Sequence, residues 1–178
     1  MSRIGKKSIK FSKNIIITLK NDIISVQGPY GILEKTFLNF VQINIFNNEL
    51  TIKLLKNDVK SCQYYGLIRS LINNMIIGVE TPYSKILILE GIGYKFQIQS
   101  NELILNVGFT HTIKFLIPID LSVILESNTK LLIKGIDKEK VGLFASKIHD
   151  IRPPEPYKGK GIFYNGEIII RKVGKTGK

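Results

Sequence analysis

Tyr65-Gly66-Leu67-Ile68-Arg69-Ser70-Leu71-Ile72 has a diverged second copy later in the chain, Val141-Gly142-Leu143-Phe144-Ala145-Ser146-Lys147-Ile148. The two octapeptides share glycine, leucine, serine and isoleucine at four of eight positions. A strand-like tetrapeptide lies upstream of each copy, Leu-Thr-Ile-Lys at 50–53 and Leu-Leu-Ile-Lys at 131–134. Two copies are too few for a solenoid. The repeat therefore predicts a tandem duplication of one small domain.

The apolar pattern around the first copy predicts strands followed by a helix. β-Branched segments at 15–19, 23–26, 41–45 and 50–54 are broken by Asn-Asp, Gly-Pro and Asn-Asn turns. A helix of about 57–76 follows, and Asp58 can cap it. Its expected apolar face includes Cys62, Tyr65, Ile68, Ile72 and Met75.

The second half has the same order. Strands are expected at 85–89, 94–99, 103–107, 112–117 and 130–134, before a helix of about 138–150 that Asp137 can cap. Strands followed by one helix, twice over, predict an α+β fold of two tandem similar domains. Each domain would be an antiparallel β-sheet packed against one α-helix. We expect the first at 1–81 and the second at 82–178, joined near 78–82.

A basic C-terminal extension follows the second helix. Prolines at 153, 154 and 156 stop the helix and hold the backbone extended. Glycines then allow the backbone to approach a partner, lysines supply charge and an aromatic ring offers a stacking surface, at Tyr157, Lys158, Gly159, Lys160 and Gly161. Asn165-Gly166 between two apolar runs predicts a hairpin. The tail 171–178 carries cations and no acid.

The net charge of +12 and the pI near 9.7 favour a polyanionic partner, either nucleic acid or an anionic membrane surface. The membrane is the weaker choice, because the apolar runs fall far short of the ~20 residues that a spanning helix needs. The N-terminal cations Arg3, Lys6 and Lys7 have no apolar core behind them, so the start resembles neither a secretory signal nor a transit peptide. A solvated lysine surface is the alternative for both basic ends.

No motif supports catalysis. A phosphate-binding loop ending at Gly174-Lys175-Thr176 would need glycine where Ile169 stands, and Gly91-Ile92-Gly93-Tyr94 lacks the rest of a dinucleotide fingerprint. The single cysteine excludes an internal disulfide and disfavours zinc. His111 and His149 are expected to be solvated or lightly packed. We therefore expect a protein that is not an enzyme, with no metal site and no cofactor.

Composition bears on the source. The chain has 22 lysines against 4 arginines, 32 isoleucines and one alanine. Codons for lysine and isoleucine are rich in A and T, whereas those for alanine are rich in G and C. The bias predicts an AT-rich genome, with a plastid or plastid relict as first choice and a low-GC bacterium or a mitochondrion as alternatives.

The string from 154 to 162 resembles the signature of a known family, ribosomal protein six of the large subunit in its bacterial and organellar form. The segments 2–7, 26–31, 91–94 and 171–178 are also similar to landmarks of that family. The resemblance covers essentially the whole chain. It implies two similar α+β domains and binding to large-subunit rRNA near the sarcin–ricin loop, beside the stalk base where GTPase translation factors dock.

By matching position, the resemblance assigns rRNA binding to Tyr157, Lys158, Gly159, Lys160, Gly161, Arg171, Lys172 and Lys175, with Tyr94 and Lys95 as weaker candidates. Further cations at the two chain ends are expected to neutralise phosphates, namely Lys178, Arg3, Lys6 and Lys7. Lysine in place of arginine loses planar bidentate phosphate contacts.

The sequence thus predicts a structural constituent of the large ribosomal subunit, with rRNA, neighbouring ribosomal proteins near the stalk base and translation-factor GTPases as partners. The alternative is a free-standing RNA-binding regulatory protein, which would share the positive charge but would be mostly absent from the ribosomal fraction.

Overall fold

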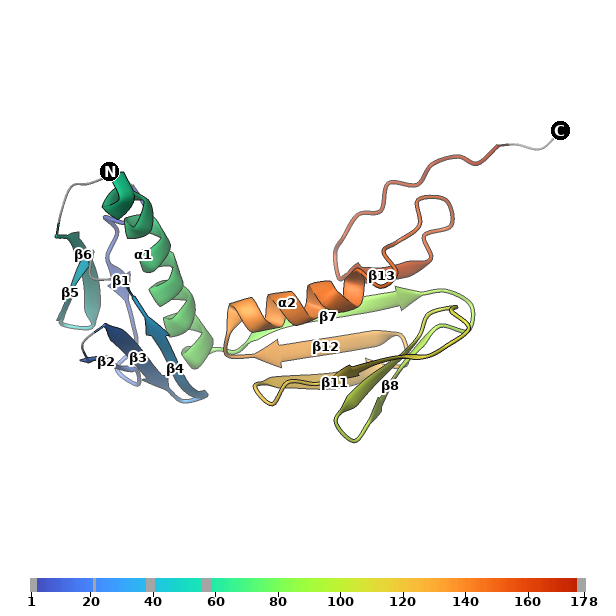
Figure 1. Cartoon of the computed structure of the whole chain (residues 1–178), viewed down its shortest axis with the longest axis horizontal. Coiled ribbons are helices and arrows are strands. Elements are labelled where there is room, and N and C mark those ends of the chain that lie inside the picture. The colour runs from blue at the N-terminus through green and yellow to red at the C-terminus, as the bar shows by residue number, and fades with distance from the viewer. Residues whose placement is uncertain (1–2, 21, 38–40, 56–58, 176–178) are drawn as a thin grey trace. The chain divides into compact units, whose positions relative to one another are not determined.

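The computed structural model describes residues 3–20, 22–37, 41–55 and 59–175, except the side chains of residues 59, 60 and 62 (Figure 1). The chain forms two compact units. Unit 1 comprises Met1–Pro82 with Ile136–Lys138, and unit 2 comprises Tyr83–Gly135 with Glu139–Lys178. Each unit contains one α-helix and antiparallel sheets, so the predicted α+β class with two similar parts is confirmed.

Unit 1 consists of two three-stranded sheets and helix α1 (Figure 1). The sheet orders are β1-β6-β5 and β2-β3-β4. The elements are β1 (Ile9–Lys10), β2 (Ile16–Lys20), β3 (Ile23–Gly28), β4 (Gly31–Thr36), β5 (Val41–Phe46), β6 (Glu49–Leu54) and α1 (Val59–Glu80). Each predicted strand of the first half is present within a few residues of its expected bounds.

Two strands of unit 1 were missing from the prediction. β1 has only two residues and pairs Ile9 with Leu50, so no alternation can reveal it. β4 contains the polar pair Glu34 and Lys35, and it becomes a strand because the turn after Gly28 folds it back onto β3. Tertiary pairing therefore decides both elements, rather than local propensity.

Helix α1 is longer than the predicted 57–76, because it continues to Glu80. The last turns carry Ile76 and Val79, which are buried in the core of unit 1. Gly28 allows this close approach, since a Cβ at Gly28 would lie 2.8 Å from the Val79 side chain. Packing thus outweighs the low helix propensity of Gly78.

The predicted apolar face of α1 is confirmed for its four described members, since Tyr65, Ile68, Ile72 and Met75 are buried. The side chain of Cys62 and the proposed cap Asp58 lie outside the described residues.

Unit 2 contains a four-stranded sheet of order β11-β12-β7-β13, a three-stranded sheet of order β10-β9-β8, and helix α2. The elements are β7 (Tyr83–Glu90), β8 (Lys95–Gln99), β9 (Glu102–Asn106), β10 (Ile113–Leu116), β11 (Leu121–Ser127), β12 (Lys130–Gly135), α2 (Lys138–His149) and β13 (Gly161–Tyr164). Helix α2 lies on one face of the larger sheet, and the chain after it leads into β13 and the tail (Figure 1). Asp137 directly precedes α2, at the predicted capping position.

β11 was missing from the prediction, because polar and apolar residues mix along it and a bulge interrupts its pairing with β12. The core of unit 2 joins α2 to both sheets through Val141, Phe144, Ala145 and Ile148 against Leu87, Leu103, Leu105, Leu131, Ile133 and Ile162.

The predicted Asn165-Gly166 hairpin is wrong, although the turn itself forms with Gly166 at φ +86°. The Glu167 N–H donates to the Tyr164 carbonyl at 3.0 Å, as in a hairpin. The Tyr164 N–H, however, donates to the Glu167 carboxylate at 2.9 Å instead of a second strand. Residues 167–175 accordingly form no strand, and Ile168 in this segment is 89% exposed.

Candidate nucleic-acid interface

The chain from Arg152 to Ile162 forms a closed loop, called here the cationic loop. The Ile162 N–H donates to the Arg152 carbonyl at 2.8 Å and closes its base. Inside it, the Glu155 N–H donates to the Lys160 carbonyl at 2.8 Å, and the Gly159 N–H donates to the Glu155 carbonyl at 3.0 Å. The loop is therefore ordered by its own backbone.

Two of its glycines occupy positions that other residues would strain. Gly159 has φ +73° and Gly161 has φ +140°. A Cβ at Gly161 would lie 2.6 Å from the Pro153 carbonyl oxygen. Both glycines are buried. The glycines thus permit close contacts within the protein. Their predicted approach to a partner stays a prediction.

The tail folds back onto this loop. The Lys172 N–H donates to the Pro156 carbonyl at 2.8 Å. The Arg171 guanidinium passes Gly159 so closely that a Cβ there would lie 3.1 Å from its nitrogen. The structure thus brings together two segments that the sequence placed ten or more residues apart. Half of the fourteen predicted rRNA-binding residues lie in this loop or in the tail segment docked on it, namely Tyr157, Lys158, Gly159, Lys160, Gly161, Arg171 and Lys172.

The cations of this surface are available to a partner. Lys158, Arg171 and Lys172 are exposed, and Lys160 is half-buried. Within the described part of the chain, none of these four side chains forms an ion pair with an acid. Tyr157 beside them is 55% exposed. The result is a group of four cations without ion-pair partners among the described residues, on the cationic loop and the docked tail segment, beside an accessible aromatic ring.

The remaining basic candidates belong to other segments of the chain. Lys175 is exposed further along the tail, and Lys178 lies outside the described residues. Arg3, Lys6 and Lys7 are exposed in unit 1, where Gly5 between them is buried against the Tyr65 ring. The Arg69 side chain donates to the Lys7 carbonyl at 3.4 Å. This N-terminal segment is therefore held on α1.

Tyr94 and Lys95, the weaker candidates, follow the turn after β7. The Tyr94 ring is packed between two glycines, since a Cβ at Gly91 or Gly108 would lie 2.4 Å or 2.8 Å from it. Tyr94 is half-buried and packs against the core of unit 2, whereas Lys95 is exposed. Their binding to rRNA stays a prediction.

Arg152 is a candidate that the sequence analysis missed. Its guanidinium carbon lies 5.6 Å from the Tyr94 ring centroid and 5.4 Å from that of Phe109, within cation–π range. The only signal in the sequence was an arginine directly before the proline cluster, and nothing linked it to a ring 43 positions earlier (152 − 109).

His149 departs from the expectation of a solvated or lightly packed histidine, because its side chain is only 17% exposed. Its ring stacks on Tyr164 with centroids 5.0 Å apart. Nε2 lies 3.8 Å from the Glu167 carboxylate, and the Lys85 ammonium lies 4.6 Å from the Tyr164 ring centroid. Desolvation raises the pKa of the Tyr164 hydroxyl, and the Asp150 and Glu167 carboxylates raise it further. This cluster packs the end of α2 against the turn that begins the tail.

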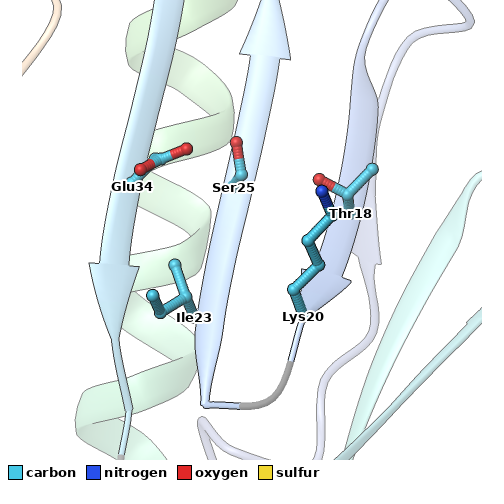
Figure 2. Close-up of a pocket in the computed structure, with 5 residues that line it drawn as sticks. All are labelled: Thr18, Lys20, Ile23, Ser25 and Glu34. Atoms are coloured by element: carbon cyan, nitrogen blue, oxygen red, sulfur yellow. The ribbon is translucent and has the colours of Figure 1, made fainter.

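A hollow of about 210 Å³ on the β2-β3-β4 sheet offers no catalytic chemistry. Figure 2 shows its lining side chains on neighbouring strands, with α1 behind them: Thr18, Lys20, Ile23, Ser25 and Glu34. Thr18 pairs with Ser25 and Ser25 with Glu34, so the lining is a cross-strand row on the exposed sheet face.

The described residues contain no group of three or more histidine, cysteine or acidic side chains placed to hold a metal ion. Within the same residues, neither helix is long and apolar enough to cross a membrane.

The comparisons with known proteins agree with one another. The family model of Ribosomal protein L6 matches residues 11–81 and 90–165. Large ribosomal subunit protein uL6 of Dictyoglomus thermophilum is 45% identical over 100% of this chain and 99% of its own length. The uL6 protein of Listeria welshimeri is 43% identical over all of both chains, and protein uL6c of Pyropia yezoensis is 44% identical over 100% of this chain and 99% of its own. The chain therefore belongs to the ribosomal protein L6 family, whose members are structural, non-enzymatic constituents of the large ribosomal subunit, where they sit with rRNA and other ribosomal proteins.

Proposed function

We propose that this protein binds large-subunit rRNA near the sarcin–ricin loop and the stalk base, through the cationic loop and the tail segment docked on it. The observation that carries the proposal is a group of four cations without acidic ion-pair partners in the described structure. Lys158 and Lys160 lie on the hydrogen-bonded cationic loop, and Arg171 and Lys172 lie on the tail segment docked on it. An ordered loop of this kind loses little conformational entropy on binding.

The chemistry of this surface suits phosphate more than base edges. Lysine ammonium groups act as compact point charges and contact phosphate oxygens without a fixed orientation, whereas the single Arg171 can form a bidentate contact. Such contacts position a protein on RNA and release counterions. Binding is therefore expected to recognise RNA shape and to weaken steeply as salt rises.

The protein then acts as a rigid brace for an rRNA fold beside the factor-binding site. No reaction of its own is required, because the stability of its two α+β units keeps the loop in place. Neighbouring ribosomal proteins near the stalk base and translation-factor GTPases are the partners that this position implies. We further propose that Lys175, Lys178 and the N-terminal Arg3, Lys6 and Lys7 neutralise additional phosphates.

The test is incorporation of a tagged Lys158→Ala, Lys160→Ala variant into large subunits. We expect reduced co-sedimentation and, with isolated rRNA, a salt slope shallower by about two, one for each lost contact. The matched control is Lys53→Ala with Lys134→Ala, two exposed strand lysines whose loss removes the same charge. Lys134 pairs with Ser84 near the start of β7. The cationic loop joins the sheet at the other end of β7, where Gly161 pairs with Glu90. Equal incorporation of both double variants, with both folded, would contradict the site.

We also propose a plastid ribosome as the setting. The support is compositional, since 22 lysines, 32 isoleucines and one alanine indicate an AT-rich gene. Mass spectrometry of purified plastid, mitochondrial and cytoplasmic ribosomes from the source cell tests it, and recovery of the peptides from another ribosome would refute it.

A further inference from the structure

Two aromatic rings lie at the surface of unit 2 in the connection between β9 and β10. The Phe109 and His111 rings are stacked, with centroids 6.0 Å apart and planes inclined by 18°. Phe109 is 43% exposed and His111 is also exposed. This aromatic pair is not among the residues that the family signature or the basic ends single out. A stacked pair in contact with solvent presents a flat π surface to a planar ligand.

The aromatic pair is held in place from below. Gly108 precedes it at φ +81°, and a Cβ there would lie 2.8 Å from the Tyr94 ring. The connection is thus seated directly on Tyr94. The Arg152 guanidinium lies within 5.6 Å of both the Tyr94 and Phe109 ring centroids. The pair is consequently ordered before any ligand arrives, which lowers the entropic cost of binding.

The surroundings indicate the class of ligand. Arg152 adds a cation beside the rings, and its carbonyl accepts the hydrogen bond that closes the cationic loop. The aromatic pair and the phosphate-binding cations therefore share one framework. A flat π surface next to fixed positive charge suits a nucleotide, whose base is planar and whose backbone is anionic.

We infer that Phe109 and His111 form a stacking site for one unpaired nucleobase of the RNA bound by this protein. The inference rests on the proposed function, and it adds a contact to a base where the cationic loop supplies contacts to phosphates. Stacking tolerates any base, so the site recognises that a base is unpaired rather than which base it is.

The experiment measures binding of the full-length protein to extracted large-subunit rRNA over a range of salt, together with ultraviolet cross-linking of the wild-type complex. Phe109→Leu keeps an apolar side chain but removes the ring. We expect binding to weaken by roughly five- to a hundredfold, the value of one stacked base, with the salt slope unchanged because no cation is lost. Phe109→Tyr should retain the affinity.

The matched control is Phe46→Leu, which removes an exposed ring from unit 1. The wild-type cross-link is expected at Phe109 or His111. This measurement does not depend on whether a variant folds. Unchanged affinity of a folded Phe109→Leu variant, or cross-links only elsewhere in the chain, would overturn the stacking site. If the Lys158→Ala, Lys160→Ala variant still shows its reduced salt slope, the proposed function stands without the site. If neither variant weakens binding, both proposals fail.

Discussion

The backbone amide of Lys172 donates a hydrogen bond to the carbonyl of Pro156, 2.8 Å away, and this bond places the tail on the cationic loop. It explains how residues on both sides of β13 contribute to one surface. It also separates two roles of Lys172, since its amide holds the tail while its ammonium faces solvent.

Replacing Lys172 in two ways distinguishes these roles. Lys172→Ala removes the charge and keeps the N–H, so the salt slope of rRNA binding should fall by about one. Lys172→Pro removes both, because proline has no N–H. We expect weaker binding still and faster tryptic cleavage of the tail after Lys175, a site that both variants keep. Identical proteolysis of the two variants would show that the hydrogen bond does not hold the tail.

Alanine substitutions at two glycines should change stability in opposite directions. Gly161→Ala places a methyl group 2.6 Å from the Pro153 carbonyl at φ +140°, and should cost about 1–3 kcal/mol of unfolding free energy. Gly142→Ala in α2 meets open space and should stabilise by about 0.5–1 kcal/mol. Denaturant melts of both variants provide the measurement. A stabilised Gly161→Ala variant would be incompatible with the loop geometry.

The equivalent isoleucines of the repeat offer a test of the proposed division at 81 and 82. Ile72 and Ile148 are both fully buried, in separate cores. Either change to alanine should cost about 2–5 kcal/mol. If the two parts unfold independently, Ile72→Ala should lower the transition followed by hydrogen exchange of α1 and leave that of α2 unchanged, with the reverse for Ile148→Ala. A shift of both transitions by either variant would indicate one cooperative unit.

Two tyrosines make the stability of the fold vary with pH in the alkaline range. Desolvation raises the pKa of Tyr83, and it raises that of Tyr164 together with the Asp150 and Glu167 carboxylates. The folded state therefore holds these protons more tightly than the unfolded state. Their contribution is fully present below the unfolded pKa of about 10 and is lost as pH rises through the folded values. Tyr164→Phe keeps the ring on His149 and should flatten the fall in melting temperature above pH of about 10.

The control for Tyr164→Phe is Tyr30→Phe, which removes one hydroxyl at an exposed position. Absorbance titration of the phenolate should show one late-ionising group fewer in Tyr164→Phe. A titration curve that matches the wild type in its last step would contradict the assignment.

Much of the fold could be predicted from the sequence, because α2 and most strands follow the spacing of apolar residues. What failed depended on contacts distant in sequence. β1 forms because it pairs with β6, and the last turns of α1 form because Val79 packs against Gly28. The hairpin is absent because the Glu167 carboxylate accepts the hydrogen bond of the Tyr164 N–H. A pattern of single residues does not carry such information.

The sequence indicated which residues belong to the candidate site, but not how they are arranged in space. The glycines and lysines of the cationic loop could be identified from their order along the chain. The docking of Lys172 on Pro156 and the Arg152–Phe109 contact depend on how β7, β13 and the β9–β10 connection meet.

The steric closure of the cationic loop has a consequence for how this gene can change. A bias toward A and T exchanges arginine for lysine and valine for isoleucine at little cost to charge or apolar volume. Glycine codons begin with two G's, yet Gly161 has a backbone angle and a carbonyl neighbour that no side chain tolerates without strain. Nucleotide drift can therefore exchange the residues of the charged surface of this protein, whereas Gly161, which the closed loop requires, is costly to replace.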